Sequence, residues 1–138
     1  MNIISVFMVL SLLAGSVNPS LQEQARIPAG ISVAFRAGNA AELSKYLNST
    51  VELLLPQKED FYKKNVAEAI LKEFFATHPT KEFIIRYQGV KNDVQYAIGN
   101  LKTEKGDFRV YFLMKTVDKG PLIHLIRIDL ENGKQNPS

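Results

Sequence analysis

The sequence predicts an α+β fold in which a curved antiparallel sheet wraps around a long helix. Apolar side chains recur every three or four residues between residues 65 and 77, and every second residue from residue 82 onward. The first spacing is typical of an amphipathic helix, and the second is typical of strands with one buried face. Helices that precede an antiparallel meander indicate an α+β domain, because each apolar face must be buried against another.

Two short helices are expected first. Residues 27–28, Ile-Pro, open a helix, and Gly38 is expected to end it, because the C′ position favours a left-handed backbone. Residues 39–42, Asn-Ala-Ala-Glu, form a capping box. In such a box the Asn39 side chain accepts the backbone amide of Glu42, and the Glu42 side chain reaches back. A second short helix therefore begins there.

A strand, a loop and the long helix come next. Residues 50–55 are predicted to be a strand, and residues 57–64 a polar loop. A second capping box at residues 65–68 opens the long helix. The helix ends before Pro79, because proline cannot continue the hydrogen-bond ladder and restricts the residue before it. The apolar stripe that faces the sheet consists of Val66, Ala67, Ile70, Leu71 and Phe74.

Four strands joined by tight turns complete the chain. The first begins near Glu82 and returns through a two-residue turn at residues 92–93, Asn-Asp. The next turn is expected to be a three-residue loop in which Gly106 takes a positive φ, so that Thr103 lies opposite Asp107. The inner face then carries Phe83, Ile85, Tyr87, Tyr96, Ile98, Val110, Phe112 and Met114.

The last turn, residues 118–120, again ends in a glycine that can take a positive φ. It is expected to place Val117 opposite Pro121. Because side chains alternate along a strand, Met114 would then face His124 on the inner face. With Tyr96 facing Met114, the three side chains are expected to form one row.

The opposite face is half apolar, so it is either unevenly solvated or covered by another subunit. In the same register Arg109 faces Asp129, an ion pair worth about 0.2 to 1 kcal/mol, and Tyr111 lies over Gly99. The residues of this outer face are Ala97, Gly99, Leu101, Arg109, Tyr111, Leu113, Lys115, Arg127 and Asp129.

The 138 residues fit one domain. Residues 3–14 form an uncharged apolar run that is too short to span a bilayer, which is typical of a signal peptide. Because no Lys or Arg precedes this run, an uncleaved N-terminal anchor is the alternative. We predict a signal peptide over residues 1–16, a linker over 17–26, a single domain over 27–131 and a disordered tail over 132–138.

Ser16 stands where a bacterial lipoprotein would carry its lipid-bearing Cys, and the chain contains no Cys. Lipidation, disulfides and thiolate metal sites are therefore excluded. We expect an exported protein, periplasmic or secreted, that is not a lipoprotein and spans no membrane after cleavage of the signal peptide.

The net charge is +3, and the isoelectric point is near 9.1. The basic residues are scattered among acids and form no run, so a nucleic-acid partner is not expected. The sequence also lacks a Gly-rich phosphate loop, zinc or calcium spacings and a nucleophile elbow, so neither a cofactor nor a metal is expected.

Three segments resemble a known superfamily. They are YAIGNLKTEKGDFRVYF at residues 96–112, FFATHP at residues 74–79 and LIRIDLE at residues 125–131. With the order of elements, these segments resemble the nuclear transport factor 2-like superfamily, also called cystatin-like. They are most similar to an uncharacterised family of small exported bacterial proteins within it. The resemblance covers residues 27–131 and implies a cone-shaped fold. Enzymes of this superfamily place an acid or base inside the cone, whereas other members are transport or scaffold subunits.

Three side chains are candidates for catalysis. His124 and Tyr96, on adjacent inner strands, have the chemistry of a general acid and base. Glu52 would join them if its strand turned it inward, although its alternation with Val51 and Leu53 favours exposure. The residues expected to line a pocket in the cone are Phe35, Tyr62, Phe74, Tyr87, Tyr96, Phe112, Met114 and His124.

The sequence therefore favours an exported, non-catalytic domain of unknown function that binds a small apolar or amphipathic ligand, or a protein. One alternative is an isomerase-like or hydrolase-like enzyme that uses the His/Tyr pair. Another is a homodimer through the outer sheet face, with an interface at Leu101, Tyr111, Leu113 and Ile123.

Overall fold

The computed structural model describes residues 27–118 and 120–131. The expected signal peptide, linker and tail, residues 1–16, 17–26 and 132–138, lie outside the described residues. In the described part the elements are α3 (Ala29–Ala37), α4 (Ala40–Ser44), β1 (Leu47–Leu55), β2 (Lys58–Lys63), α5 (Lys64–Thr77), β3 (Thr80–Lys91), β4 (Val94–Thr103), β5 (Gly106–Val117) and β6 (Gly120–Leu130).

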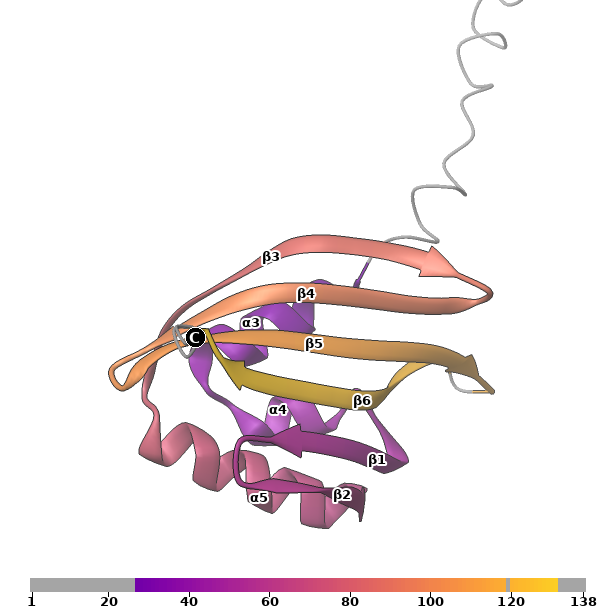
Figure 1. Cartoon of the computed structure of the whole chain (residues 1–138). Coiled ribbons are helices and arrows are strands. Elements are labelled where there is room, and N and C mark those ends of the chain that lie inside the picture. The colour runs from indigo at the N-terminus through magenta and orange to yellow at the C-terminus, as the bar shows by residue number, and fades with distance from the viewer. Residues whose placement is uncertain (1–26, 119, 132–138) are drawn as a thin grey trace, which may run out of the picture.

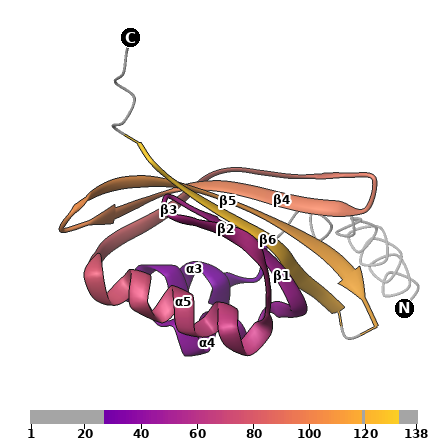
Figure 2. The same ribbon diagram turned by 60° about the horizontal axis from the view of Figure 1, so that its bottom comes forward.

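The strands form one sheet in the order β2-β1-β6-β5-β4-β3 (Figure 1). All neighbouring strands are antiparallel except β1 and β6, which run parallel. The helices α3, α4 and α5 lie together on the concave side of the sheet (Figure 2). The α+β fold is therefore confirmed, but the sheet is mixed rather than wholly antiparallel.

The junction between α3 and α4 follows the predicted chemistry. Gly38 adopts a left-handed backbone with φ of 64°, and its amide donates to the carbonyl of Phe35. The Asn39 side chain accepts the Glu42 amide at 3.0 Å, which satisfies one of the free donors at the start of α4. The Glu42 carboxylate does not reach back, because it pairs with Lys45 at 3.0 Å. Only the Asn39 half of the capping box is formed.

The predicted loop over residues 57–64 is wrong, because Lys58–Lys63 forms the edge strand β2. Its backbone pairs with β1, and this pairing does not depend on apolar side chains. The cap predicted at Asn65 is also wrong, because α5 already begins at Lys64 and its N-cap, Lys63, makes no side-chain cap. The end of α5 at Thr77 agrees with the prediction.

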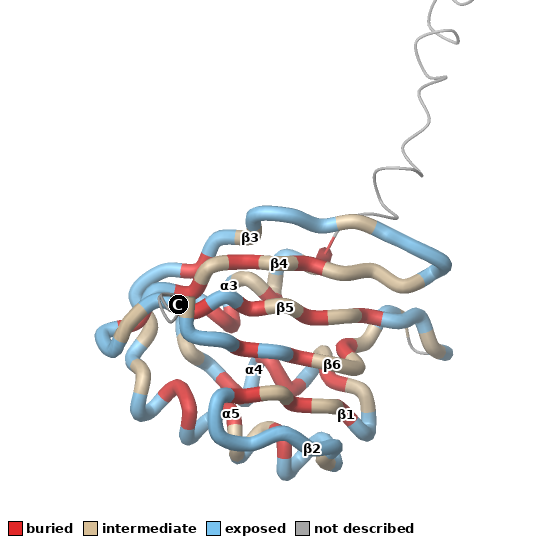
Figure 3. Tube along the Cα trace, in the orientation of Figure 1, coloured by how far each residue is buried: buried red, intermediate tan, exposed pale blue. Residues whose placement is uncertain are grey.

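The core lies between the helices and the concave face of the sheet (Figure 3). Phe35 of α3 is at its centre: its ring stacks on Phe83 and Phe112, with centroid distances of 4.7 and 5.9 Å. Phe75 of α5 meets the same ring edge-on at 6.3 Å. Four aromatic rings from both layers therefore hold the helices on the sheet.

The turn between β4 and β5 differs from the predicted one. Thr103 pairs with Gly106, which leaves a two-residue loop instead of three residues. The Thr103 hydroxyl donates to the Gly106 carbonyl at 2.8 Å and accepts from the Lys105 amide at 3.0 Å. Because this side chain closes the turn, Gly106 joins the ladder one position earlier than expected.

That shift of one residue exchanges the two faces of β4. Ala97 and Leu101 are fully buried, and Gly99 shares their inner face. Tyr96 and Ile98, which were predicted to point inward, lie on the outer face instead. The prediction for β5 is correct, since Val110, Phe112 and Met114 are fully buried.

A β-bulge in β6 compensates for a similar shift at the next turn. Val117 pairs with Gly120 rather than Pro121, and Met114 pairs with Ile123 rather than His124. Leu113 then pairs with Leu125, so one extra residue is inserted in β6. Beyond the bulge the predicted pairs are restored. They are Phe112 with Ile126, Val110 with Ile128 and Arg109 with Asp129.

The hairpin of β3 and β4 closes as predicted, with Asn92 and Asp93 at φ of 52° and 66°. Tyr87 also pairs with Ile98 as expected, but a second bulge between Ile85 and Tyr87 moves Tyr87 to the outer face. Its side chain is 68% exposed. The expectation that Tyr87 lines the inside of the cone is therefore wrong.

Candidate functional site

The interior of the described domain holds no acid or base. Ser44 and Thr103 are the only polar residues among those buried in the described part of the chain. The Ser44 hydroxyl donates to the Ala41 carbonyl at 3.0 Å, and the Thr103 hydroxyl closes its own turn. Both hydroxyl groups have hydrogen-bond partners nearby in the chain. Among the described residues, the core between helices and sheet therefore holds no buried group for proton transfer.

The expected row of Tyr96, Met114 and His124 does not form. Met114 is fully buried on the inner face, whereas Tyr96 lies on the outer face with its ring beside Gly89. His124 lies in the β6 bulge, between the fully buried Ile123 and the outer Leu125. Its Nδ1 is 3.1 Å from the Leu122 carbonyl oxygen. The register shift at the turns is the reason for this difference.

Glu52 points to the outer face of the sheet, as its alternation with Val51 and Leu53 predicts. Val51 and Leu53 are fully buried, and Glu52 between them is half-buried on the outer face, beside Leu125 of β6. Strands β6 and β5 separate β1 from β4, so Glu52 and Tyr96 lie on backbones about 14 Å apart. The structure does not bring the three catalytic candidates together.

Most residues expected to line a pocket are core residues instead. Phe35, Phe112 and Met114 are fully buried, and Phe74 is 8% exposed. Tyr62 of β2 is half-buried and packs against this core. These side chains fill the space between the two layers.

Phe74 does reach the wall of a groove between α5 and the turn joining β1 to β2. The groove has a volume of about 300 Å³. His78 stacks on Phe74 with a centroid distance of 4.3 Å, and its Nδ1 lies 2.9 Å from the Phe74 carbonyl oxygen. His78 therefore completes the C-terminal end of α5, as its position in the sequence predicts. The groove is lined by Leu55, Pro56, Gln57, Lys58, Ile70, Glu73, Phe74, Thr77 and His78.

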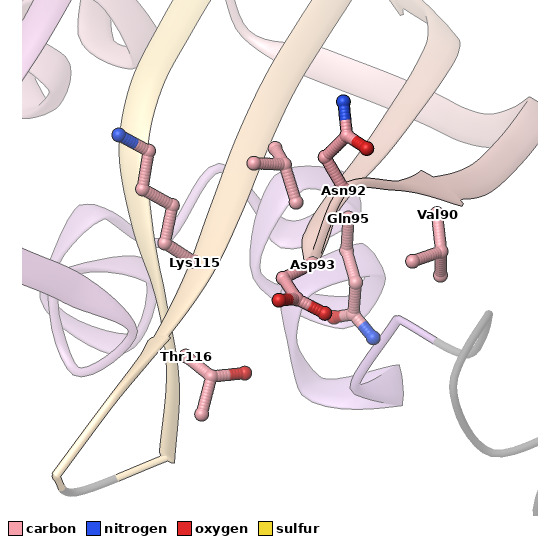
Figure 4. A pocket seen from close by; sticks show the side chains of 7 residues that line it. Val90, Asn92, Asp93, Gln95, Lys115 and Thr116 are labelled. Carbon is pink, nitrogen blue, oxygen red and sulfur yellow. The ribbon is translucent and has the colours of Figure 1, made fainter.

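A larger hollow, of about 670 Å³, lies where the hairpin of β3 and β4 approaches the end of β5. We call it the hairpin-end hollow, and Figure 4 shows the side chains around it. Gln95 pairs with Met114 and therefore belongs to the concave face. The ends of these hairpins project beyond the helices (Figure 2). The hollow is lined by Val90, Asn92, Asp93, Val94, Gln95, Lys115 and Thr116.

The hairpin-end hollow combines apolar and polar groups. Two valines lie beside amides, a hydroxyl, one carboxylate and one ammonium group. In Figure 4 the Lys115 side chain extends away from Asp93 and Gln95. The lining offers hydrogen-bond donors and acceptors to a ligand, but it contains no His and no second carboxylate for acid–base catalysis.

Neither a metal site nor a membrane span is found in the described residues. No group of three or more His, Cys, Asp or Glu side chains gathers there in a way that could hold a metal ion. None of the described helices is both long and apolar enough to cross a bilayer.

A family model described as "Domain of unknown function (DUF4783)" matches residues 28–129. The chain belongs to the DUF4783 family. A crystal structure of a DUF4783 family protein from Bacteroides ovatus is 38% identical, covers 75% of this chain and 94% of its own, and has a TM-score of 0.73. A second, from Bacteroides fragilis, is 35% identical with coverages of 76% and 99% and a TM-score of 0.72. Curated protein sequences give no match.

More distant structures show the fold of the DUF4783 domain. An NTF2-like protein of unknown function from Cytophaga hutchinsonii is 12% identical, with coverages of 75% and 86% and a TM-score of 0.55. A domain with a cystatin-like fold from Nostoc punctiforme is 13% identical, with coverages of 74% and 71% and a TM-score of 0.59. The expected nuclear transport factor 2-like fold is confirmed.

The outer face of this DUF4783 domain carries a hollow that the sequence did not predict. Leu101 and Ile123, two of the residues expected at a dimer interface, are fully buried and unavailable to a second copy. The expected ion pair of Arg109 and Asp129 is absent too, because Asp129 pairs with Arg127 at 2.9 Å. A hollow of about 400 Å³ lies beside Arg109. The signal in the sequence was Asn100, a polar residue that interrupts the run of apolar residues and glycine from Tyr96 to Leu101.

Proposed function

We propose that this DUF4783 protein is an exported, non-catalytic domain that binds a small amphipathic ligand in the hairpin-end hollow. The observation that carries this proposal is the contrast between a core without ionisable groups and a hollow with mixed lining. Acid–base catalysis needs positioned titratable groups, and binding needs only shape and a few polar contacts.

The size and chemistry of the hollow support a small ligand. Its volume of about 670 Å³ falls within the range of roughly 300 to 1,000 Å³ that is usual for ligand pockets. Val90, which pairs with Gln95 on the concave face, would contact the apolar part of the ligand, while Asp93 and Thr116 would bind its polar part. Asp93 lies in the two-residue turn that joins β3 to β4, where its backbone has a positive φ of 66°.

The binding test uses the exported protein, residues 17–138. Mixtures of lipids and small metabolites would be incubated with the protein, and native mass spectrometry with thermal shift would detect retained ligands. We expect at least one amphipathic ligand to bind. Asp93→Asn and Thr116→Val should weaken its binding, since they remove a charge and a hydroxyl from the hollow.

Two substitutions outside the hollow are the matched controls. Asp60→Asn, on the exposed edge strand β2, and Thr50→Val, on β1, remove the same groups elsewhere and should leave binding unchanged. Asn retains the left-handed turn at residue 93 because it tolerates positive φ. Failure to retain any ligand, or equal binding by all four variants, would contradict the proposal.

Export has its own test. We propose that residues 1–16 are removed on export, on the basis of the apolar run before Ser16. The intact mass of protein recovered outside the cytoplasm should then correspond to a chain that begins at Val17. A full-length mass in the membrane fraction would instead support the uncleaved anchor.

A further inference from the structure

A hollow on the convex face of the sheet carries two guanidinium groups beside apolar side chains. We propose that it is a second binding site, specific for a carboxylate attached to an apolar group. Its volume is about 400 Å³. We call it the convex hollow; its lining residues are Arg86, Tyr87, Ile98, Asn100, Arg109 and Glu131. Asn100 and Arg109 pair with each other and alternate with the fully buried Leu101 and Val110, so this hollow lies on the face opposite the core. The helices cover the concave face (Figure 2).

Arg86 is held in place by a chain of hydrogen bonds. Its Nε donates to Asn100 Oδ1 at 2.6 Å, and Asn100 Nδ2 donates to Glu131 Oε1 at 2.6 Å. The two ends of the Asn100 amide are thereby oriented by different partners. The terminal nitrogens of Arg86 make no further hydrogen bond with the described residues, so they remain available to a ligand.

Arg109 has no side-chain hydrogen bond or ion pair within residues 27–118 and 120–131, although two carboxylates are near it. Asp129 lies directly opposite Arg109 in the β5–β6 ladder, but its carboxylate binds Arg127 Nε at 2.9 Å. Glu131 binds Asn100 instead. Both neighbouring acids are engaged elsewhere, which leaves the Arg109 guanidinium free for an external anion.

The lining selects among anions. A guanidinium group presents a planar fork that binds a carboxylate through two parallel hydrogen bonds. Tyr87, 68% exposed, and Ile98 add apolar surface beside this fork. The hollow also contains Glu131, so two positive charges face one negative charge. Inorganic phosphate has no apolar group to contact this surface, and we therefore assign the site to a carboxylate that carries one.

This carboxylate has two natural sources: a free aromatic acid, or the C-terminus of a peptide that ends in an apolar residue. The probes are phenylacetate, its neutral analogue phenylacetamide, inorganic phosphate and an acetylated dipeptide ending in Phe. Chemical-shift titration of the full chain at low ionic strength, where surface charges are least screened, measures each affinity. We expect phenylacetate or the dipeptide to shift residues of the convex hollow, with phenylacetamide and phosphate much weaker.

Three arginine variants locate the site. Arg109→Gln and Arg86→Gln should each weaken binding by about 10-fold or more, because each removes a charge-assisted hydrogen bond. Arg36→Gln is the matched control, since Arg36 is exposed on α3 on the other side of the sheet, and it should have no effect. All three side chains are exposed, and unchanged thermal unfolding would verify that the variants fold.

Arg127→Gln tests the reason why Arg109 is free. This substitution releases Asp129, which lies opposite Arg109 and should then bind it and compete with the ligand. Binding should therefore weaken although Arg127 does not line the hollow. Equal affinity for phenylacetate and phenylacetamide, tighter binding of phosphate, or unchanged binding by Arg109→Gln would overturn the proposal. A response to the dipeptide alone would support it and assign the site to a polypeptide C-terminus.

Discussion

The ring of Phe83 lies directly against the backbone of Gly99. A Cβ atom at position 99 would be 2.8 Å from Phe83 Cζ and 2.8 Å from the carbonyl oxygen of Ile84. The first atom belongs to the aromatic stack of the core, and the second belongs to the adjacent strand. Glycine at this position therefore sets how closely β3 and the core approach β4.

Gly99→Ala is expected to destabilise the protein by about 1 to 3 kcal/mol, because both the ring and the strand backbone must move. Gly89→Ala is the matched control on the same pair of strands. There the added methyl would meet the end of the Tyr96 side chain, which can rotate outward. Urea unfolding of both variants measures the difference, and an equal loss of stability would show that Phe83 does not constrain Gly99.

Thr103 is expected to hold the β4–β5 turn through its hydroxyl. Thr103→Val removes the hydrogen bonds to the Gly106 carbonyl and from the Lys105 amide, and should cost about 1 to 2 kcal/mol in unfolding free energy. Thr103→Ser retains the hydroxyl and should be much closer to the original protein. If Val and Ser destabilise the protein equally, the hydroxyl has no part in closing the turn.

Phe35 is expected to be the most sensitive core residue. Phe35→Ala removes the ring that stacks on Phe83 and Phe112, and should cost about 3 to 5 kcal/mol. Phe61→Ala on β2, where the ring is 63% exposed, should change stability by no more than about 0.5 kcal/mol. Chemical denaturation provides both values, and a small effect at Phe35 would be inconsistent with the observed stack.

Only one of the two predicted Asn caps is formed, and mutation should distinguish them. Asn39→Ala removes the 3.0 Å hydrogen bond to the Glu42 amide and should cost about 1 kcal/mol. Asn65→Ala should be neutral or slightly stabilising, because Asn65 lies inside α5 and Ala is the better helix former. Thermal unfolding of the pair gives the comparison; the reverse order of stability would contradict these caps.

Apart from β2, which is predicted as a loop, the sequence predicts the element order well because apolar periodicity and turn residues are local signals. It also predicts correctly which side chains of β5 face the core. Of the two sets of alternating residues in that strand, only one is strongly apolar. In β4 both sets of alternating residues contain apolar side chains. Tyr96 and Ile98 belong to one set, and Ala97 and Leu101 belong to the other. The choice between them depended on whether the loop had two or three residues, and the Thr103 side chain decided that.

The candidate sites were harder to predict because they depend on nonlocal pairing. The bulge at His124 and the bulge before Tyr87 each move an aromatic or titratable side chain, and neither bulge has a distinct sequence signal. The convex hollow depends on Asn100 linking Arg86 to Glu131, residues that are far apart along the chain. Such a network becomes visible only when the register of the four strands β3 to β6 is known.

The two outer strands of the sheet determine how the molecule can meet other chains. At one edge, β2 presents Lys58, Glu59, Asp60 and Lys63, and at the other edge a bulge at Arg86 interrupts β3. Charged side chains and bulges at an edge oppose the addition of a further strand from another molecule. Both edges of the sheet are therefore protected against edge-to-edge aggregation, which favours contact with other molecules through the faces of the sheet.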